Sequence, residues 1–81
     1  MTTQKDIFEL IRLERISQDI RFGKQQHSPL FWLAILTEEV GEVATELQDA
    51  AVDKYRLRAE LVQCAAVAVA WLEAMDAEKA D

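Results

Sequence analysis

The apolar residues of this 81-residue chain recur at intervals of three and four positions and do not alternate with polar ones. Such spacing places them along one face of a helix and predicts an all-α protein. Only two Gly and one Pro interrupt the pattern. The expected helices cover residues 4–21, 29–51 and 55–78, within a single domain that spans residues 1–81.

Local signals mark where the first two helices begin. Thr3 and Asp6 have the spacing of a capping box. Ser28 is a favoured N-cap, and Pro29 suits the first helical position because its missing N–H has no partner to lose there. Residues 22–27 are expected to form a loop, and a short polar connection around Asp53 is expected to precede the third helix.

The third helix is apolar on nearly every side. Residues 61–72 read LVQCAAVAVAWL, and a helix of this kind needs neighbours all around it. Two other helices of an 81-residue chain cover only part of it. The sequence therefore predicts a three-helix protomer that completes a four-helix-type bundle by self-association, as a dimer or tetramer. The alternative is a three-helix monomer with an exposed Ala-rich side.

Composition excludes several classes of protein. With 51% hydrophobic residues the chain is too apolar for a disordered protein, and its net charge of −6 argues against binding a nucleic acid polymer or an anionic membrane. The first ten residues include Asp6 and Glu9 and do not resemble a signal peptide. The apolar run 61–72 is too short to span a bilayer. The lone cysteine, Cys64, fits a reducing, cytoplasmic setting.

The negative charge is concentrated in one segment. Residues 28–53 hold six acids and no Lys or Arg, whereas the rest of the chain holds nine acids and nine bases. At about 100° per residue, four of these acids share one quadrant of the second helix: Glu38, Glu39, Glu42 and Glu46. Like charges in this arrangement are destabilising, and a divalent cation would offset them. The alternative is a solvated acidic face.

Glu60 is the one acid between residues 53 and 73. If the second and third helices pack antiparallel, as their short connection indicates, Glu60 faces the carboxylates of the second helix. Oxygen ligands from two facing helices suit Mg²⁺ or Mn²⁺. One His and one Cys are too few for a structural zinc site within one chain.

Two acidic motifs resemble those of the MazG-like nucleoside triphosphate pyrophosphohydrolases. The first is LTEEVGEVA at residues 36–44, and the second is RAELVQ at 58–63, followed by an Ala- and Val-rich helix. The segments RFGKQ at 21–25 and HSPLFWLAIL at 27–36 are similar to the part of that family that precedes its acidic helix. The resemblance covers residues 21–75.

The resemblance implies an all-α dimer or tetramer that hydrolyses a nucleoside triphosphate to the monophosphate and pyrophosphate with Mg²⁺, often as a house-cleaning enzyme for non-standard nucleotides. Carried over by position, the metal ligands are Glu39, Glu42 and Glu60, and Glu38 orients or deprotonates the attacking water. Gln63 stands where the family has its last acidic ligand. It offers a carbonyl oxygen to the metal but no charge, so weaker Mg²⁺ binding and reduced activity are expected. The rival interpretation is a non-catalytic helical oligomeric module with the same fold.

Other residues are candidates for binding the substrate. Trp32 can stack on a nucleobase, although aromatic residues at helical spacing are more often core, and Trp71 is expected at an interface. Basic and polar residues near the helix ends can bind the triphosphate, or they are simply solvated: Lys54, Arg58, Gln25, His27 and Lys24. Gly41, inside the acidic helix, is expected to allow close approach of another helix.

Overall fold

The computed structural model describes residues 2–79, with side chains through residue 78, and the regular structure of this part of the chain is entirely helical. Three helices follow one another: α1 at Gln4–Phe22, α2 at Pro29–Glu46 and α3 at Lys54–Lys79. The all-α prediction is confirmed. The single-domain prediction for residues 1–81 also includes residues 1, 80 and 81, which lie outside the described residues.

The predicted caps form. The Thr3 hydroxyl accepts a hydrogen bond from the Asp6 backbone N–H over 3.2 Å, and the Asp6 carboxylate accepts one from Thr3 N–H over 3.0 Å. The Ser28 hydroxyl accepts from Phe31 N–H over 3.3 Å. Gly23 ends α1 with a φ of 68°, in the left-handed region that glycine adopts without steric cost.

Helix α2 ends at Glu46, five residues before the predicted end at residue 51. Its last turn contains no basic residue, and the acids that crowd its C-terminal half oppose the helix dipole. Gln48 N–H then bonds to Thr45 O over 3.1 Å, in a tighter turn. Asp53 caps α3, because its carboxylate accepts hydrogen bonds from the N–H groups of Tyr55 and Arg56.

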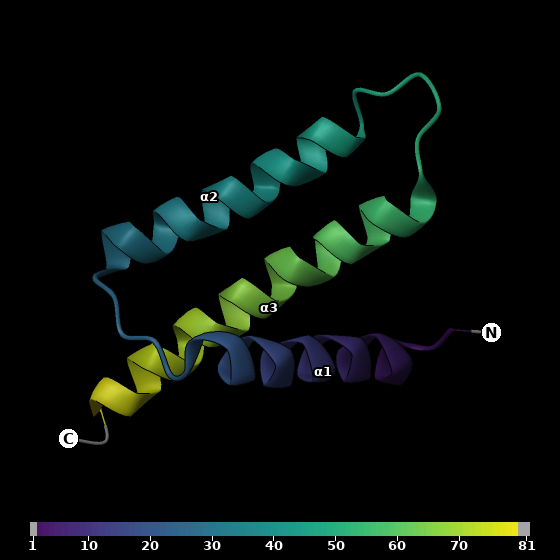
Figure 1. Ribbon diagram of the computed structural model, residues 1–81. Helices are drawn as coiled ribbons and strands as arrows, with labels where there is room; N and C mark the ends of the chain where they lie inside the picture. The colour runs from purple at the N-terminus through teal and green to yellow at the C-terminus, as the bar shows by residue number, and fades with distance from the viewer. Residues whose placement is uncertain (1, 80–81) are drawn as a thin grey trace.

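Helix α3 lies between the other two and packs against both (Figure 1). Trp32, near the start of α2, stacks on Trp71, near the end of α3, with ring centroids 6.5 Å apart. At the other end of the helix pair, Glu46 Oε1 at the end of α2 lies 3.8 Å from Arg56 Nε at the start of α3. These two pairs establish the predicted antiparallel packing of α2 and α3. In the described part of the chain α1 and α2 do not pack against each other.

The core of the single chain is small. Its buried apolar residues, among those described, are Trp32, Ala66, Val67 and Ala74, and α1 contributes none. The radius of gyration is 14.0 Å, against about 11.7 Å for a compact chain of this length. Trp71 is half-buried against Trp32, so it packs within this chain. Among the described helices, none is both long and apolar enough to cross a membrane.

Candidate metal centre

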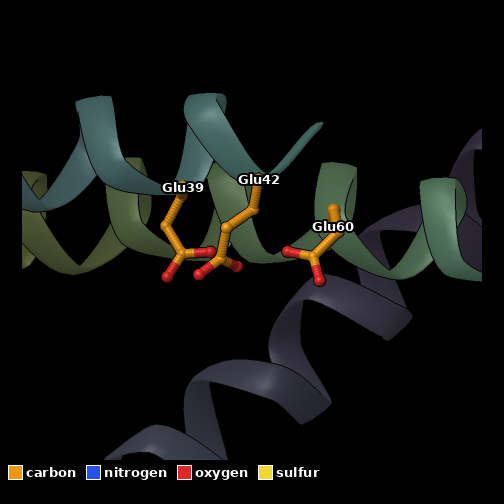
Figure 2. A group of neighbouring side chains, drawn as sticks. All are labelled: Glu39, Glu42 and Glu60. Carbon is orange, nitrogen blue, oxygen red and sulfur yellow. The ribbon is translucent and has the colours of Figure 1, made fainter. Parts of the chain in front are cut away.

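Three carboxyl groups meet where α2 faces α3. Glu39 and Glu42 are three residues apart on α2 and therefore share a face, and the antiparallel packing brings Glu60 of α3 opposite them. One carboxylate oxygen from each residue lies within 4.8 Å of the others. Figure 2 shows the carboxyl groups of Glu39 and Glu42 descending from α2 and that of Glu60 reaching into the same space. We call this set the three-carboxylate cluster.

The cluster is electrostatically strained. A hydrogen bond with Glu42 is the main cause that raises the pKa of Glu60, followed by burial and by the charges of Glu42 and Glu39. Burial is the main cause that raises the pKa of Glu39, followed by the charges of Glu42 and Glu38. Without a cation, burial and the neighbouring carboxylates therefore disfavour the charged forms of Glu39 and Glu60.

Two carboxylate oxygens of the cluster have no hydrogen-bond partner among the described residues. Oε2 of Glu39 and Oε2 of Glu60 are enclosed and have no hydrogen-bond partner in the described structure, an arrangement that is costly for a carboxylate. Oxygen donors of this kind fit a hard divalent cation. Burial, followed by the neighbouring carboxylates, raises the pKa of the Cys64 thiol. Cys64 therefore stays protonated and is a poor metal ligand.

The cluster lies on the wall of a cavity of about 530 Å³. All three helices and the loop after α1 line it. The charged and aromatic lining residues outside the cluster are Arg15, Asp19, Arg21, Phe22, Lys24, Trp32 and Glu73. The cavity therefore has an acidic wall formed by α2 and α3, and basic groups from α1 and the loop that follows it.

The structure brings together seven of the residues that the sequence predicts for the site. The cavity is lined by Glu39, Glu42, Glu60, Gln63, Lys24, Gln25 and Trp32. Trp32 is 3% exposed, and its indole N–H has no hydrogen-bond partner.

The other four predicted residues do not line the cavity. Glu38 is exposed beside Glu39. Lys54 begins α3, and Arg58 lines a separate, shallower hollow with Tyr55. His27 supports the cavity wall from outside, because its ring lies 4.9 Å from that of Trp32 and its Nε2 lies 2.8 Å from Gln25 Oε1.

Three residues of α1 that the sequence did not predict for the site also line the cavity: Arg15, Gln18 and Arg21. Arg15 and Gln18 are three residues apart on an otherwise apolar helix face, and this is the signal that could have drawn attention to them. Gly41 has open space around the position of an added Cβ, so no other helix of this chain packs closely against it.

Comparisons of the chain with models of protein families, with curated proteins and with solved structures found no match.

Proposed function

We propose that this protein is a MazG-like, Mg²⁺-dependent pyrophosphohydrolase that cleaves a nucleoside triphosphate to the monophosphate and pyrophosphate. The observation that carries the proposal is the approach of Glu39, Glu42 and Glu60 oxygens to within 4.8 Å of one another on the wall of a cavity. Mn²⁺ satisfies the same oxygen ligands. A cytoplasmic location, where a lone thiol stays reduced, belongs to the same proposal.

The chemistry requires charge neutralisation, since a triphosphate and an acidic cluster repel each other. A cation bound by the three-carboxylate cluster supplies that neutralisation and polarises the phosphoryl group. Water attacks the α-phosphorus, the bond to the bridging oxygen breaks, and pyrophosphate leaves with the electron pair. In this proposal Glu38, exposed beside Glu39, accepts the proton of the attacking water.

The rest of the cavity offers contacts for the nucleotide. Trp32, expected to stack on the base, is a core residue at 3% exposure and forms the wall behind the cavity. We propose that Gln25 contacts the base, with His27 holding it in place, and that Arg21 and Lys24 attract the phosphates. Lys54 and Arg58 have no contact with the ligand in this proposal, because neither lines the cavity and Arg58 lines a separate hollow. A substrate range that includes non-standard nucleotides follows from the resemblance alone.

We propose that a second copy of the chain covers its exposed apolar faces, as a dimer or a larger four-helix-type assembly. The chain exposes 6270 Å², whereas a compact monomer of 9.2 kDa exposes about 4,900 Å². The excess of roughly 1,300 Å² exceeds the area that one partner buries in a standard interface, about 800 Å². Large apolar side chains on α1 and α2 supply this surface, including Phe8, Leu13, Ile20, Leu30 and Phe31.

One observation favours a second candidate function, a non-catalytic helical oligomeric module. Gln63 replaces an acid at the position where the resemblance places the last metal ligand, which lowers the charge available to hold a cation. Retention of Glu39, Glu42 and Glu60 in one cluster favours the enzyme, because an assembly module gains nothing from repelling carboxylates.

Product analysis tests the proposal. The purified protein is incubated with Mg²⁺ and a panel of ribo- and deoxyribonucleoside triphosphates, and pyrophosphate is separated from orthophosphate. The enzyme releases pyrophosphate and loses that activity in Glu39→Gln and Glu42→Gln, while the module releases neither product. Release of orthophosphate alone, or unchanged activity in both variants, would rule out the proposed reaction.

A further inference from the structure

A series of three hydrogen-bonded side chains joins α1 to α3 beside the carboxylates. Arg15 Nη1 donates to Gln18 Oε1 over 3.0 Å, and Gln18 Nε2 donates to Gln63 Oε1 over 3.3 Å. All three side chains line the cavity. We call this series the Arg15 relay.

The chemistry of Arg15 fixes the direction of the relay. A guanidinium group only donates hydrogen bonds, so Gln18 must turn its amide oxygen toward Arg15 and its NH₂ group toward Gln63. Gln63 must then present its own oxygen to Gln18. The guanidinium is itself held in place, because it donates to Asp19 over 2.9 Å and to Glu73 over 3.0 Å, and the Arg15 side chain is only 12% exposed.

The relay leaves Gln63 with a free donor beside the acidic cluster. Within residues 2–78, Gln63 makes its side-chain hydrogen bond with Gln18, through the oxygen. Its NH₂ group has no acceptor in that part of the chain, and Gln63 follows Glu60 by three residues, on the same face of α3. An amide N–H cannot bind a cation, but it donates readily to an anionic oxygen.

We propose that Gln63 Nε2 binds a phosphoryl oxygen of the ligand, with Gln18 and Arg15 as positioning residues, and that Gln63 is not a ligand of the cation. That the anion is a polyphosphate rests on the proposed function, whereas the donor character of Gln63 rests on the relay. Gln63 thus performs the task opposite to that of an acid at the same position: it attracts the anion and leaves the cation to Glu39, Glu42 and Glu60.

Separate titrations of the anion and the cation test this assignment. Inorganic tripolyphosphate is titrated calorimetrically, in saturating Mg²⁺ and again in EDTA, and Mg²⁺ is titrated without the anion. The proteins are wild type, Gln63→Met and Gln18→Met, with Gln26→Met as the matched control, because Gln26 lines the same cavity outside the relay. Met preserves side-chain length and helix propensity.

Gln63→Met is expected to weaken tripolyphosphate binding by roughly tenfold or more, the usual effect of losing a hydrogen bond to a charged group. Its Mg²⁺ affinity should stay within about twofold of wild type. Gln18→Met should weaken tripolyphosphate binding less. A double variant that combines Gln18→Met with Gln63→Met should resemble Gln63→Met alone, because the two residues act as one unit. Gln26→Met should behave as wild type. Gln63→Glu, which keeps the shape of the side chain but removes the donor, should also weaken tripolyphosphate binding in saturating Mg²⁺, where the cation neutralises the three-carboxylate cluster.

Weaker Mg²⁺ binding by Gln63→Met with unchanged tripolyphosphate binding would overturn the inference and make Gln63 a cation ligand. Wild-type protein that binds tripolyphosphate under neither condition would overturn it as well. Failure of the proposed reaction is recognised separately, as absence of pyrophosphate release from every nucleotide while the Gln63 effect on tripolyphosphate persists. Helical circular dichroism and thermal unfolding confirm that each variant is folded.

Discussion

Glu39 and Glu60 keep their carboxyl groups together against repulsion because the packing of α2 on α3 holds them there. Burial and neighbouring carboxylates raise the pKa of Glu39, while a hydrogen bond with Glu42, then burial, raises that of Glu60. In each case the folded chain disfavours the charged form. The charged carboxylates of Glu39 and Glu60 therefore destabilise the folded chain most at neutral pH in the absence of a cation. A bound cation would stabilise it most under the same condition.

In a buffer with EDTA, we expect the free energy of unfolding to fall as the pH rises above 4.5. Both folded pKa values are raised above the ordinary 4.5, so between that value and the raised pKa the folded chain binds more protons than the unfolded chain. Stability from the protonated groups is present at low pH and is lost as the pH rises through the folded pKa. Urea unfolding at a series of pH values measures the slope.

The matched control for this slope is Glu38→Gln, which removes one charge from the same helix at an exposed position. In Glu39→Gln, the free energy of unfolding should decrease less as the pH rises. In Glu38→Gln, most of the decrease seen in wild type should remain. A slope in wild type no steeper than in Glu39→Gln would show that burial of Glu39 does not affect stability.

The spacing of acidic residues in the sequence predicted the carboxylate part of the site. Glu39 and Glu42 lie together because residues three apart share a helix face, and Glu60 joins them through the antiparallel packing that a short connection implies. Arg15 and Gln18 could not be assigned in this way. Their partners Glu73 and Gln63 lie 58 and 45 residues further along the chain, and only the way α1 crosses α3 decides which side chains meet.

At the scale of elements, α3 organises the molecule because both other helices pack against it. The starts of α1 and α2 could be predicted, since capping by Thr3 and Ser28 depends on neighbouring residues alone. The end of α2 could not, because no Gly or Pro follows Glu46, residues 47–51 include good helix formers, and the stop depends on acidic charge at the C-terminus.

Gly41 provides a test of helix packing. Gly41→Ala is expected to raise the free energy of unfolding by about 0.5–1 kcal/mol, because an added Cβ meets nothing within 4 Å. Thermal and urea unfolding measure the change. Loss of stability together with a smaller assembly would instead show that a helix of a second copy packs closely on Gly41.

At the scale of the whole molecule, the chain is open: it measures 48 × 30 × 20 Å and its few buried residues include none from α1. Small domains with so little core are commonly stabilised by oligomerisation. The sequence predicted this need from an α3 that is apolar on nearly all sides, but the arrangement of copies depends on surfaces that no single-chain pattern specifies.

We therefore expect the protein in solution to have at least twice the 9.2 kDa mass of the chain and a thermal midpoint that rises with concentration. Ile20 is 80% exposed on α1, so a charged residue at this position should disrupt an apolar interface between copies. Ile20→Glu should shift the assembly toward smaller species in analytical ultracentrifugation, whereas Lys5→Glu, a charge change at an exposed position of the same helix, should not. A wild-type monomer at all concentrations would contradict the proposed self-association.

Calorimetric titration of Mg²⁺ into the nucleotide-free protein shows whether the three-carboxylate cluster is a cation site. We expect saturable binding that Glu39→Gln and Glu42→Gln each weaken by at least about tenfold, since even residues that only support a ligand have effects of that size. Glu38→Gln should bind Mg²⁺ nearly as wild type does. Absence of binding by wild type, or equal binding by Glu39→Gln and Glu38→Gln, would contradict the proposed cation site.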